Sequence, residues 1–247
     1  MMHAPISLPA RLNAALTLPG RHLTSFLADA AERWPTQTLT LDGLEFTYEK
    51  AWFRVLQIAT WLQQNGVSKG DRVLTVIRHS PDLHLISLAV AHIGAVISVL
   101  SLETRTAAFT RIIEESQPTC VFLEQSSRHL KAAVPEALTV WMESGLSGGG
   151  WEEADFIEVS TTAPAWGMPF PGTSADPAVL VYANSSSHGV LLSHDRVCSM
   201  LNESRDSGDG LLAIFDSMER QQPDAAELFA ALPESATAAA AEIIEVG

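Results

Sequence analysis

Residues 83–102 read LHLISLAVAHIGAVISVLSL and contain no Asp, Glu, Lys or Arg. An uncharged run of this length is long enough to span a bilayer. Two histidines and three serines dilute it, and Gly94 divides it into Leu83 to Ile93 and the β-rich run Ala95 to Leu100. The segment therefore predicts a buried helix followed by a buried parallel strand, which together give this kind of continuous apolarity.

Short apolar strands and amphipathic helices alternate around this segment. Pro81 is typical of the first turn of a helix. Gly66 is expected to end the preceding helix, Ala51 to Gln64. The alternation predicts an α/β fold, in which a parallel sheet is flanked by helices on both faces. The expected helices are His22 to Trp34, Ala51 to Gln64 and Thr106 to Ser116, and the expected strands are Thr38 to Leu41, Leu44 to Tyr48, Arg72 to Ile77 and Cys120 to Leu123.

The pattern changes from Ser144 to Thr173, where Gly, Ser, Pro and Trp predominate. Such composition is typical of loops. We therefore expect a first α/β subdomain over residues 1–143, an irregular connecting region over 144–175 and a partial second α/β subdomain over 176–247. The second is expected to hold strands at Ala178 to Tyr182, Val190 to Leu192 and Leu211 to Phe215, and helices from Asp195 and over Ala225 to Leu232.

Composition bounds the class of protein. Of 247 residues, 47% are hydrophobic and 18% charged, as in a folded globular chain. The formal charge of −14 excludes general nucleic-acid binding, but a small anion could still bind backbone amides. The two cysteines, Cys120 and Cys198, exclude a disulfide framework and fit a reducing compartment. Because the N-terminus does not resemble a secretory signal, we expect a cytoplasmic protein without a membrane partner.

Four segments carry a resemblance. They read GLEFTYE (43–49), GVSKGDRV (66–73), LAVAHIGAV (88–96) and YANSSSHGVLLSH (182–194). Their order and spacing resemble the N-terminal part of the adenylate-forming enzymes, which include acyl-CoA synthetases, nonribosomal peptide adenylation domains and luciferases. The resemblance covers roughly residues 20–240. It implies the N-terminal subdomains of that family, with the second one incomplete, and ATP with magnesium as cofactors of an active member.

The fourth segment corresponds to the family's phosphate loop. There the family has a Ser/Thr/Gly-rich loop and Pro-Lys-Gly between two strands, and backbone amides and hydroxyls cradle the ATP phosphates. The resemblance places Ser185, Ser186, Ser187, His188 and Gly189 at these positions. The loop lacks the family's glycines, is shorter, and has a histidine in place of the lysine. We therefore expect a degenerate phosphate loop and assign no catalytic residue.

Other polar and aromatic residues give weaker signals. Neither His188 with His194 nor His79 with His84 has the spacing of a helical zinc motif, so no metal site is expected. Ser193 is expected to cap the helix that follows it. Trp151 and Trp166 lie in the irregular region and are the expected contact residues for a partner.

Three functions remain open. The first is a truncated, catalytically inactive adenylation-like protein without a cofactor, which acts as an interaction or scaffold partner in natural-product or acyl-chain biosynthesis. Its partner would be a carrier protein, a larger synthetase or a second copy. This reading expects the family's later ribose-binding segment and C-terminal domain to be missing beyond Gly247. The second is an active acyl- or aminoacyl-AMP ligase, alone or as half of a split enzyme, that uses ATP and magnesium. The third is a small-ligand binder or a different enzyme, with Ser186, His188 and His194 facing a cavity.

Overall fold

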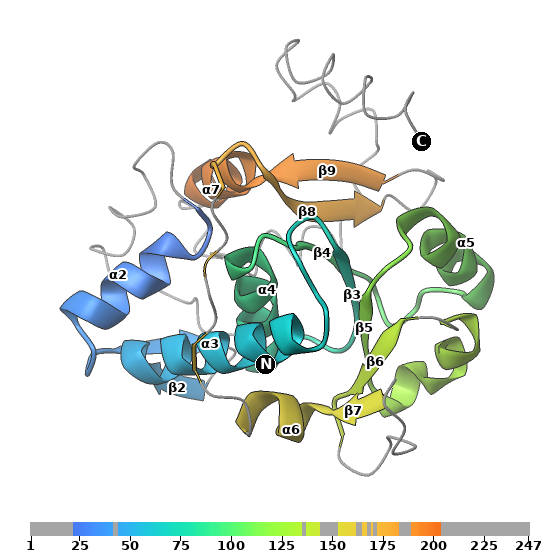
Figure 1. Ribbon diagram of the computed structural model, residues 1–247, viewed down its shortest axis with the longest axis horizontal. Coiled ribbons are helices and arrows are strands. Elements are labelled where there is room, and N and C mark those ends of the chain that lie inside the picture. Colours follow the sequence, from blue (N-terminus) through green and yellow to red (C-terminus); the bar gives the residue numbers. More distant parts are fainter. Residues whose placement is uncertain are drawn as a thin grey trace, which may run out of the picture.

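A seven-stranded sheet organises the chain (Figure 1). The computed structural model describes residues 22–41, 44–134, 137–143, 153–161, 165–166, 169, 172–182 and 189–203. The strand order is β7-β6-β5-β3-β4-β8-β9, and every neighbouring pair is parallel except β8 with β9. The strands are β3 (Arg72–Val76), β4 (Val96–Val99), β5 (Cys120–Leu123), β6 (Leu138–Trp141), β7 (Glu153–Asp155), β8 (Pro177–Tyr182) and β9 (Gly189–Ser193). A separate hairpin pairs β1 (Thr38–Leu41) with β2 (Leu44–Thr47).

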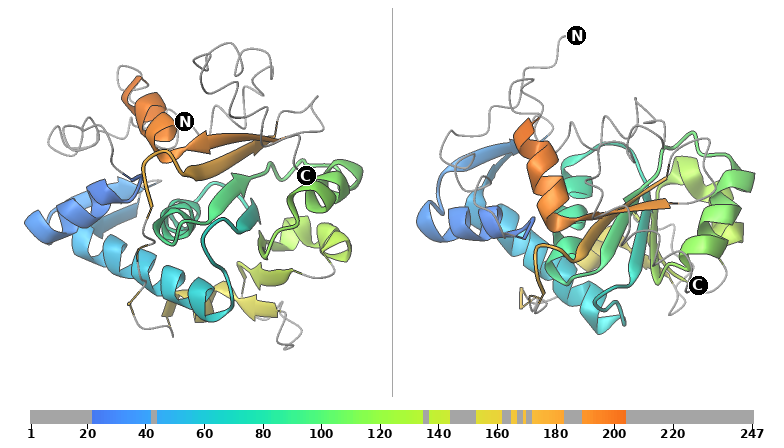
Figure 2. Two further views of the ribbon diagram at one scale, coloured as in Figure 1. Left: turned by 45° about the horizontal axis from the view of Figure 1, so that its top comes forward. Right: turned by 90° about the horizontal axis from the view of Figure 1, so that it is seen from above.

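Helices cover both faces of the sheet, as Figure 2 shows. Side chains of β3 alternate between two cores: Val73 belongs to the larger core, and Leu74 and Val76 belong to the smaller one. The larger core is covered by α2 (Ser25–Arg33), α3 (Tyr48–Gln64), α4 (Pro81–His92), α6 (Phe156–Thr161) and α7 (His194–Glu203), and the smaller by α5 (Thr106–Ser116) and the 3₁₀ segment η1 (Gln125–Ala133). The predicted α/β class with a mostly parallel, helix-flanked sheet is confirmed.

The apolar segment 83–102 forms helix α4 and strand β4, as predicted. Ser80 caps α4 by accepting a hydrogen bond from the amide of Leu83, and Pro81 occupies the first turn. Every residue from Leu83 to His92 is buried, because the sheet covers one side of α4 and α3 covers another. Among the described residues, no helix is long and apolar enough to cross a membrane.

The region 144–175 differs from its prediction. It was expected to be irregular, yet its described part contains strand β7 and helix α6. Elements of three and six residues are too short to produce a recognisable hydrophobic period. Strands β8 and β9, expected in a second subdomain, join the same sheet beside β4. The elements expected at Leu211 to Phe215 and Ala225 to Leu232 lie outside the described residues.

The C-terminus of α5 is locally strained. Gln117 ends this helix with φ 45° and ψ 61°, in the left-handed region that glycine adopts without a steric penalty. Its backbone amide nevertheless donates to the carbonyl of Ile113, so the cap itself is formed. The strain therefore comes from the side chain and not from a missing hydrogen bond.

Gln117→Gly should raise the free energy of unfolding by about 0.5–1 kcal/mol, because it removes the left-handed penalty. Urea denaturation monitored by circular dichroism measures the change. Gln117→Ala is the matched control: it shortens the side chain but keeps the β-carbon, so it should give no gain. Equal stability of the glycine and alanine variants would contradict this explanation.

Candidate functional site

The candidate site lies on the β8–β9 hairpin, where the sequence predicts a degenerate phosphate loop. Ser185, Ser186, Ser187 and His188 lie outside the described residues. Gly189, the last of the predicted site residues, is the first residue of β9 and pairs with Tyr182 across the hairpin. The structure therefore confirms two strands flanking the loop and describes the contacts of its final residue.

Gly189 has a structural reason to be glycine. A β-carbon at this position would lie 2.5 Å from the Leu180 side chain and 3.1 Å from the Tyr182 ring. Real β-carbons do not approach other atoms as closely as the first of these distances. A larger residue would therefore displace the side chains that pack across the hairpin.

The backbone amide of Gly189 is occupied by a carboxylate. It donates a hydrogen bond to Oε1 of Glu115, on helix α5, over 3.1 Å. In a phosphate loop, backbone amides of this kind are the donors that bind the anion. Here the donor at the end of the loop is already paired with a negative charge supplied by the protein.

The electrostatic environment of Tyr182 agrees with this. Burial, together with the negative charge of Glu115, raises the pKa of the Tyr182 phenol to about 12. A phenolate is disfavoured beside a carboxylate. The described end of the loop therefore carries a negative side chain next to Gly189.

The other end of the predicted segment anchors helix α7. Ser193 caps this helix, as predicted, since its Oγ accepts a hydrogen bond from the amide of Arg196 over 3.2 Å. His194 is completely buried and does not face open space, which is where the small-ligand hypothesis expected it. The amide of Leu23 donates to its Nδ1 over 3.3 Å, and the His22 ring lies edge-on at a centroid distance of 4.9 Å.

A second place for a ligand would be the carboxyl edge of the sheet between β3 and β5. The chain runs from β3 to β4 on one side and then returns to β5 on the other, and such reversal points often bind ligands. Here Arg78 donates from its backbone amide and its guanidinium to the carboxylate of Glu124. Burial would raise the pKa of Glu124, but hydrogen bonds from Arg78 and Ser126 hold it below its usual value. An internal ion pair therefore occupies this edge.

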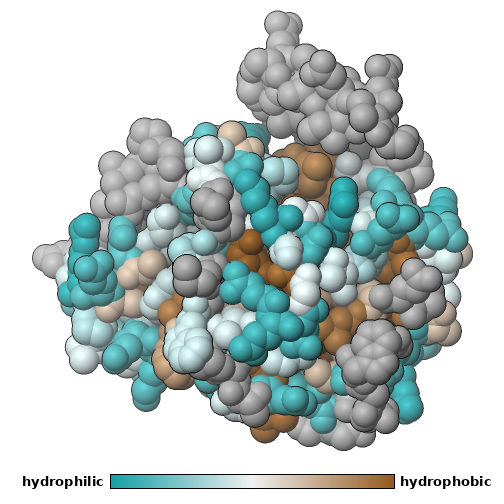
Figure 3. All heavy atoms as spheres, in the orientation of Figure 1, coloured by the Kyte–Doolittle hydropathy of each residue, from teal (hydrophilic) through white to brown (hydrophobic). Residues whose placement is uncertain are grey.

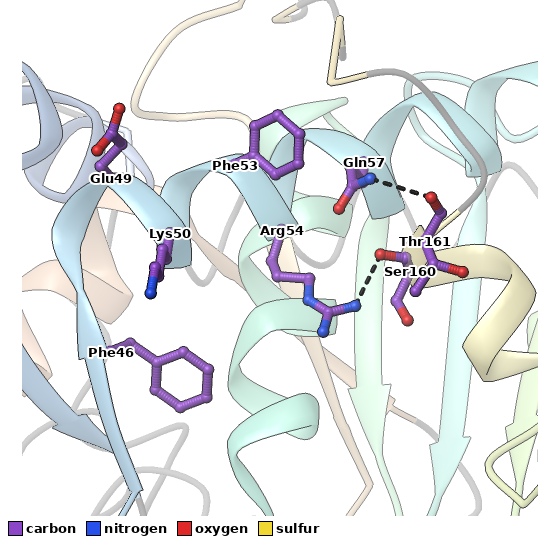
Figure 4. Close-up of a pocket in the computed structure, with 8 residues that line it drawn as sticks. All are labelled: Phe46, Glu49, Lys50, Phe53, Arg54, Gln57, Ser160 and Thr161. Carbon is purple, nitrogen blue, oxygen red and sulfur yellow. Dashed lines mark hydrogen bonds between the residues drawn. The ribbon is translucent and has the colours of Figure 1, made fainter.

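A surface groove lies between β2, α3 and α6 (Figure 4). We call it the α3 groove. It encloses about 510 Å³. Arg54 donates to the carbonyl of Ser160 over 2.7 Å, and this contact joins α3 to the end of α6. The lining residues are Phe46, Glu49, Lys50, Phe53, Arg54, Gln57, Ser160 and Thr161.

The groove was not predicted from the sequence. Lys50, Arg54 and Gln57 recur at helical spacing within the Ala51 to Gln64 helix and its start, and this is a usable signal for one polar face of the helix. The side of the groove formed by α6 was not predictable from sequence, because that helix lies in the region expected to be irregular. Of the two tryptophans expected to contact a partner, Trp166 is 74% exposed and Trp151 lies outside the described residues.

The described residues contain no group of three or more His, Cys, Asp or Glu side chains that could hold a metal ion. Both cysteines are buried as free thiols.

The parallel sheet and the antiparallel β8–β9 hairpin at its edge form an α/β domain of the architecture expected for the adenylate-forming type. Comparison with known proteins gives the same class. Residues 27–214 match the family model described as AMP-binding enzyme. The chain belongs to this family of AMP-binding enzymes.

Individual relatives are similar over parts of their length. Acetyl-coenzyme A synthetase from Arabidopsis thaliana is 33% identical over 125 residues, which cover 48% of this chain and 17% of that protein. The hybrid PKS-NRPS synthetase pydA from Acremonium sp is 27% identical over 193 residues, which cover 73% of this chain and 4% of that protein. The chain thus spans much less than two thirds of these relatives.

Solved structures show the same fold. A CoA ligase from Rhodopseudomonas palustris, described as a long-chain-fatty-acid ligase, superimposes with a TM-score of 0.67 at 22% identity. The superposition covers 77% of this chain and 49% of the ligase. The similarity therefore establishes the shared fold. It does not establish the activity.

His194 should make stability depend on pH. Burial, together with the nearby His22, lowers its pKa from 6.5 to about 4, so the folded protein holds this ring neutral. As the pH falls from 7 to 5, the unfolded chain takes up a proton that the folded chain does not. Stability should fall by about 2 kcal/mol from this residue alone.

Urea denaturation of the wild type and of His194→Asn at pH 7 and pH 5 tests this prediction. The asparagine oxygen can still accept from the Leu23 amide, but it does not titrate. The drop in stability should therefore be about 2 kcal/mol smaller in the variant. An equal drop in both proteins would show that other groups cause the pH dependence.

Proposed function

We propose that this chain does not carry out ATP-dependent acyl activation and acts instead as a protein-interaction or scaffold partner. The observation that carries the proposal is the hydrogen bond from the Gly189 amide to the Glu115 carboxylate. An anion-binding loop works by presenting unpaired donors and positive charge. This loop ends in a donor paired with a carboxylate, and His188 stands where the family has lysine.

The charge next to Gly189 supports the proposal. A triphosphate would bring several negative charges close to the exposed Glu115 carboxylate, which repels them. Imidazole is mostly neutral at pH 7, so His188 offsets little of this repulsion. Cofactor binding is therefore disfavoured both by geometry and by charge, and we propose that no cofactor is bound.

The relatives support the proposed setting. One of them is a hybrid PKS-NRPS synthetase and others are acyl-CoA synthetases or ligases, which fits a natural-product or acyl-chain biosynthetic pathway. In such a pathway we expect the partner to be a carrier protein or a larger synthetase, with a second copy of the chain as the alternative. We place the protein in the cytoplasm.

A second function is favoured by family membership itself. The matched family consists of AMP-binding enzymes, and strands β8 and β9 still flank the loop as the sequence resemblance expects. An acyl- or aminoacyl-AMP ligase, or half of a split one, would bind ATP and magnesium through Ser185, Ser186, Ser187, His188 and Gly189. The two functions differ in one measurable property. Only a ligase would use ATP when a carboxylic acid or amino acid substrate is added.

Isothermal titration with MgATP and ATP–pyrophosphate exchange test the proposal. We expect no heat of binding, and no exchange with acetate, fatty acids, aromatic acids or amino acids. His188→Lys should not restore exchange by itself, because Glu115 still occupies the Gly189 amide. The Arabidopsis acetyl-coenzyme A synthetase with acetate serves as the positive control for the assay. Exchange by the wild-type chain with any of these acids would overturn the proposal.

A further inference from the structure

Exposed apolar side chains gather around helix α3. Four large hydrophobic residues are highly exposed in the described part of the chain: Leu44, Phe53, Ile157 and Trp166, at 57%, 52%, 58% and 74%. Phe53 belongs to α3 itself, and the other three lie on segments packed against this helix. Exposed apolar side chains that gather in one region are typical of an interaction surface.

Three contacts tie these segments to α3. Leu44 lies on β2, which leads directly into the helix and packs against it. Ile157 lies on α6, whose last carbonyls accept hydrogen bonds from Arg54 and from Gln57. The backbone amide of Trp166 donates to Thr60 Oγ1 over 3.0 Å. The segments that carry these apolar residues are thus held against α3, which lowers the ordering cost of binding.

The α3 groove lies within this surface. Figure 4 shows Phe46, Lys50 and Arg54 on one side of the helix, with Phe53 and Glu49 on the other. Figure 3 shows brown apolar surface reaching solvent where Figure 1 places α6. A groove of about 510 Å³ beside an exposed phenylalanine accommodates one or two anchoring side chains of another protein.

The charge of the groove differs from that of the chain. The lining contains two cations, Lys50 and Arg54, and one carboxylate, Glu49. The whole chain, in contrast, has 29 acidic and 15 basic residues. Arg54 already donates a hydrogen bond to the Ser160 carbonyl and lies near Asp82. Of the two cations, Lys50 is therefore the more available to pair with a carboxylate of a partner. A positive spot between aromatic side chains complements a segment that combines apolar and acidic residues.

We propose that the α3 groove is a docking site for an acidic, amphipathic segment of a partner protein. Apolar side chains of that segment contact Phe46 and Phe53, and one of its carboxylates pairs with Lys50. A second copy of this chain is the other candidate occupant, and the test below distinguishes it from an acidic segment of a partner. This inference rests on the proposed interaction function and names its surface.

A phage-displayed library of random twelve-residue peptides provides the probe. Selection on the wild-type chain should enrich peptides that combine Asp or Glu with Leu, Ile, Phe or Trp. Binding of the enriched peptides, measured by fluorescence anisotropy, should weaken at least tenfold in Lys50→Glu and in Phe53→Asp. It should also weaken as salt is raised, because screening acts on the exposed Lys50 pair. Hydrogen–deuterium exchange should show protection of α3 and α6 on peptide addition.

Arg111→Glu is the matched control, since it reverses a charge on the exposed side of α5, over the other face of the sheet. It should leave peptide binding unchanged. Thermal melts check that each variant is folded. If Phe53→Asp does not fold, the binding measured with Lys50→Glu tests the inference. Equal binding to all variants, or enrichment of basic peptides, would overturn the inference. So would a concentration-dependent dimer that Phe53→Asp dissociates, because a second copy would then be the occupant. ATP–pyrophosphate exchange is measured separately, so the two proposals fail independently.

Discussion

The rest of the structure depends on the burial of helix α4 between the sheet and helix α3. All residues from Leu83 to His92 are buried, so this helix has no solvent-exposed face between these positions. Burial of this kind contributes roughly 1.5–3 kcal/mol for each large aliphatic side chain. It requires a sheet on one side and a second helix on the other. The β3–α4–β4 unit and its cover by α3 are therefore inseparable.

The burial of α4 positions both the β8–β9 hairpin and the α3 groove. Because α3 must cover α4, it turns Val55, Ile58 and Leu62 inward and leaves Phe53 and Lys50 facing outward. Because β8 pairs with β4, the β8–β9 hairpin extends the same sheet and places Gly189 beside α5. Helix α5 in turn supplies the carboxylate that occupies the Gly189 amide. Gly189 and the α3 groove thus lie against helices on opposite faces of the sheet.

Elements with a clear apolar pattern between turn residues were predictable from sequence, and those inside the loop-like region 144–175 were not. Helix α5 and strand β5 have the predicted boundaries, since a proline or a polar turn follows each apolar period. Strand β7 and helix α6 were missed because the Gly, Ser, Pro and Trp residues around them are typical of loops. The Glu115–Gly189 contact joins residues 74 positions apart, and no local pattern reports such a pairing. The loop's departure from its family was readable in the residues themselves, whereas the charge beside it needed the fold.

The two surfaces also differ in what a single substitution can change. Phosphate binding needs several donors placed together, so one unfavourable carboxylate weakens it, and restoring one lysine does not rebuild it. Protein docking on the α3 groove draws on apolar area and one exposed charge, so it tolerates an imperfect fit and depends on a few anchors. A substitution in the loop can therefore abolish phosphate binding while the helix that covers the core stays in place, because α4 still needs α3 to cover it.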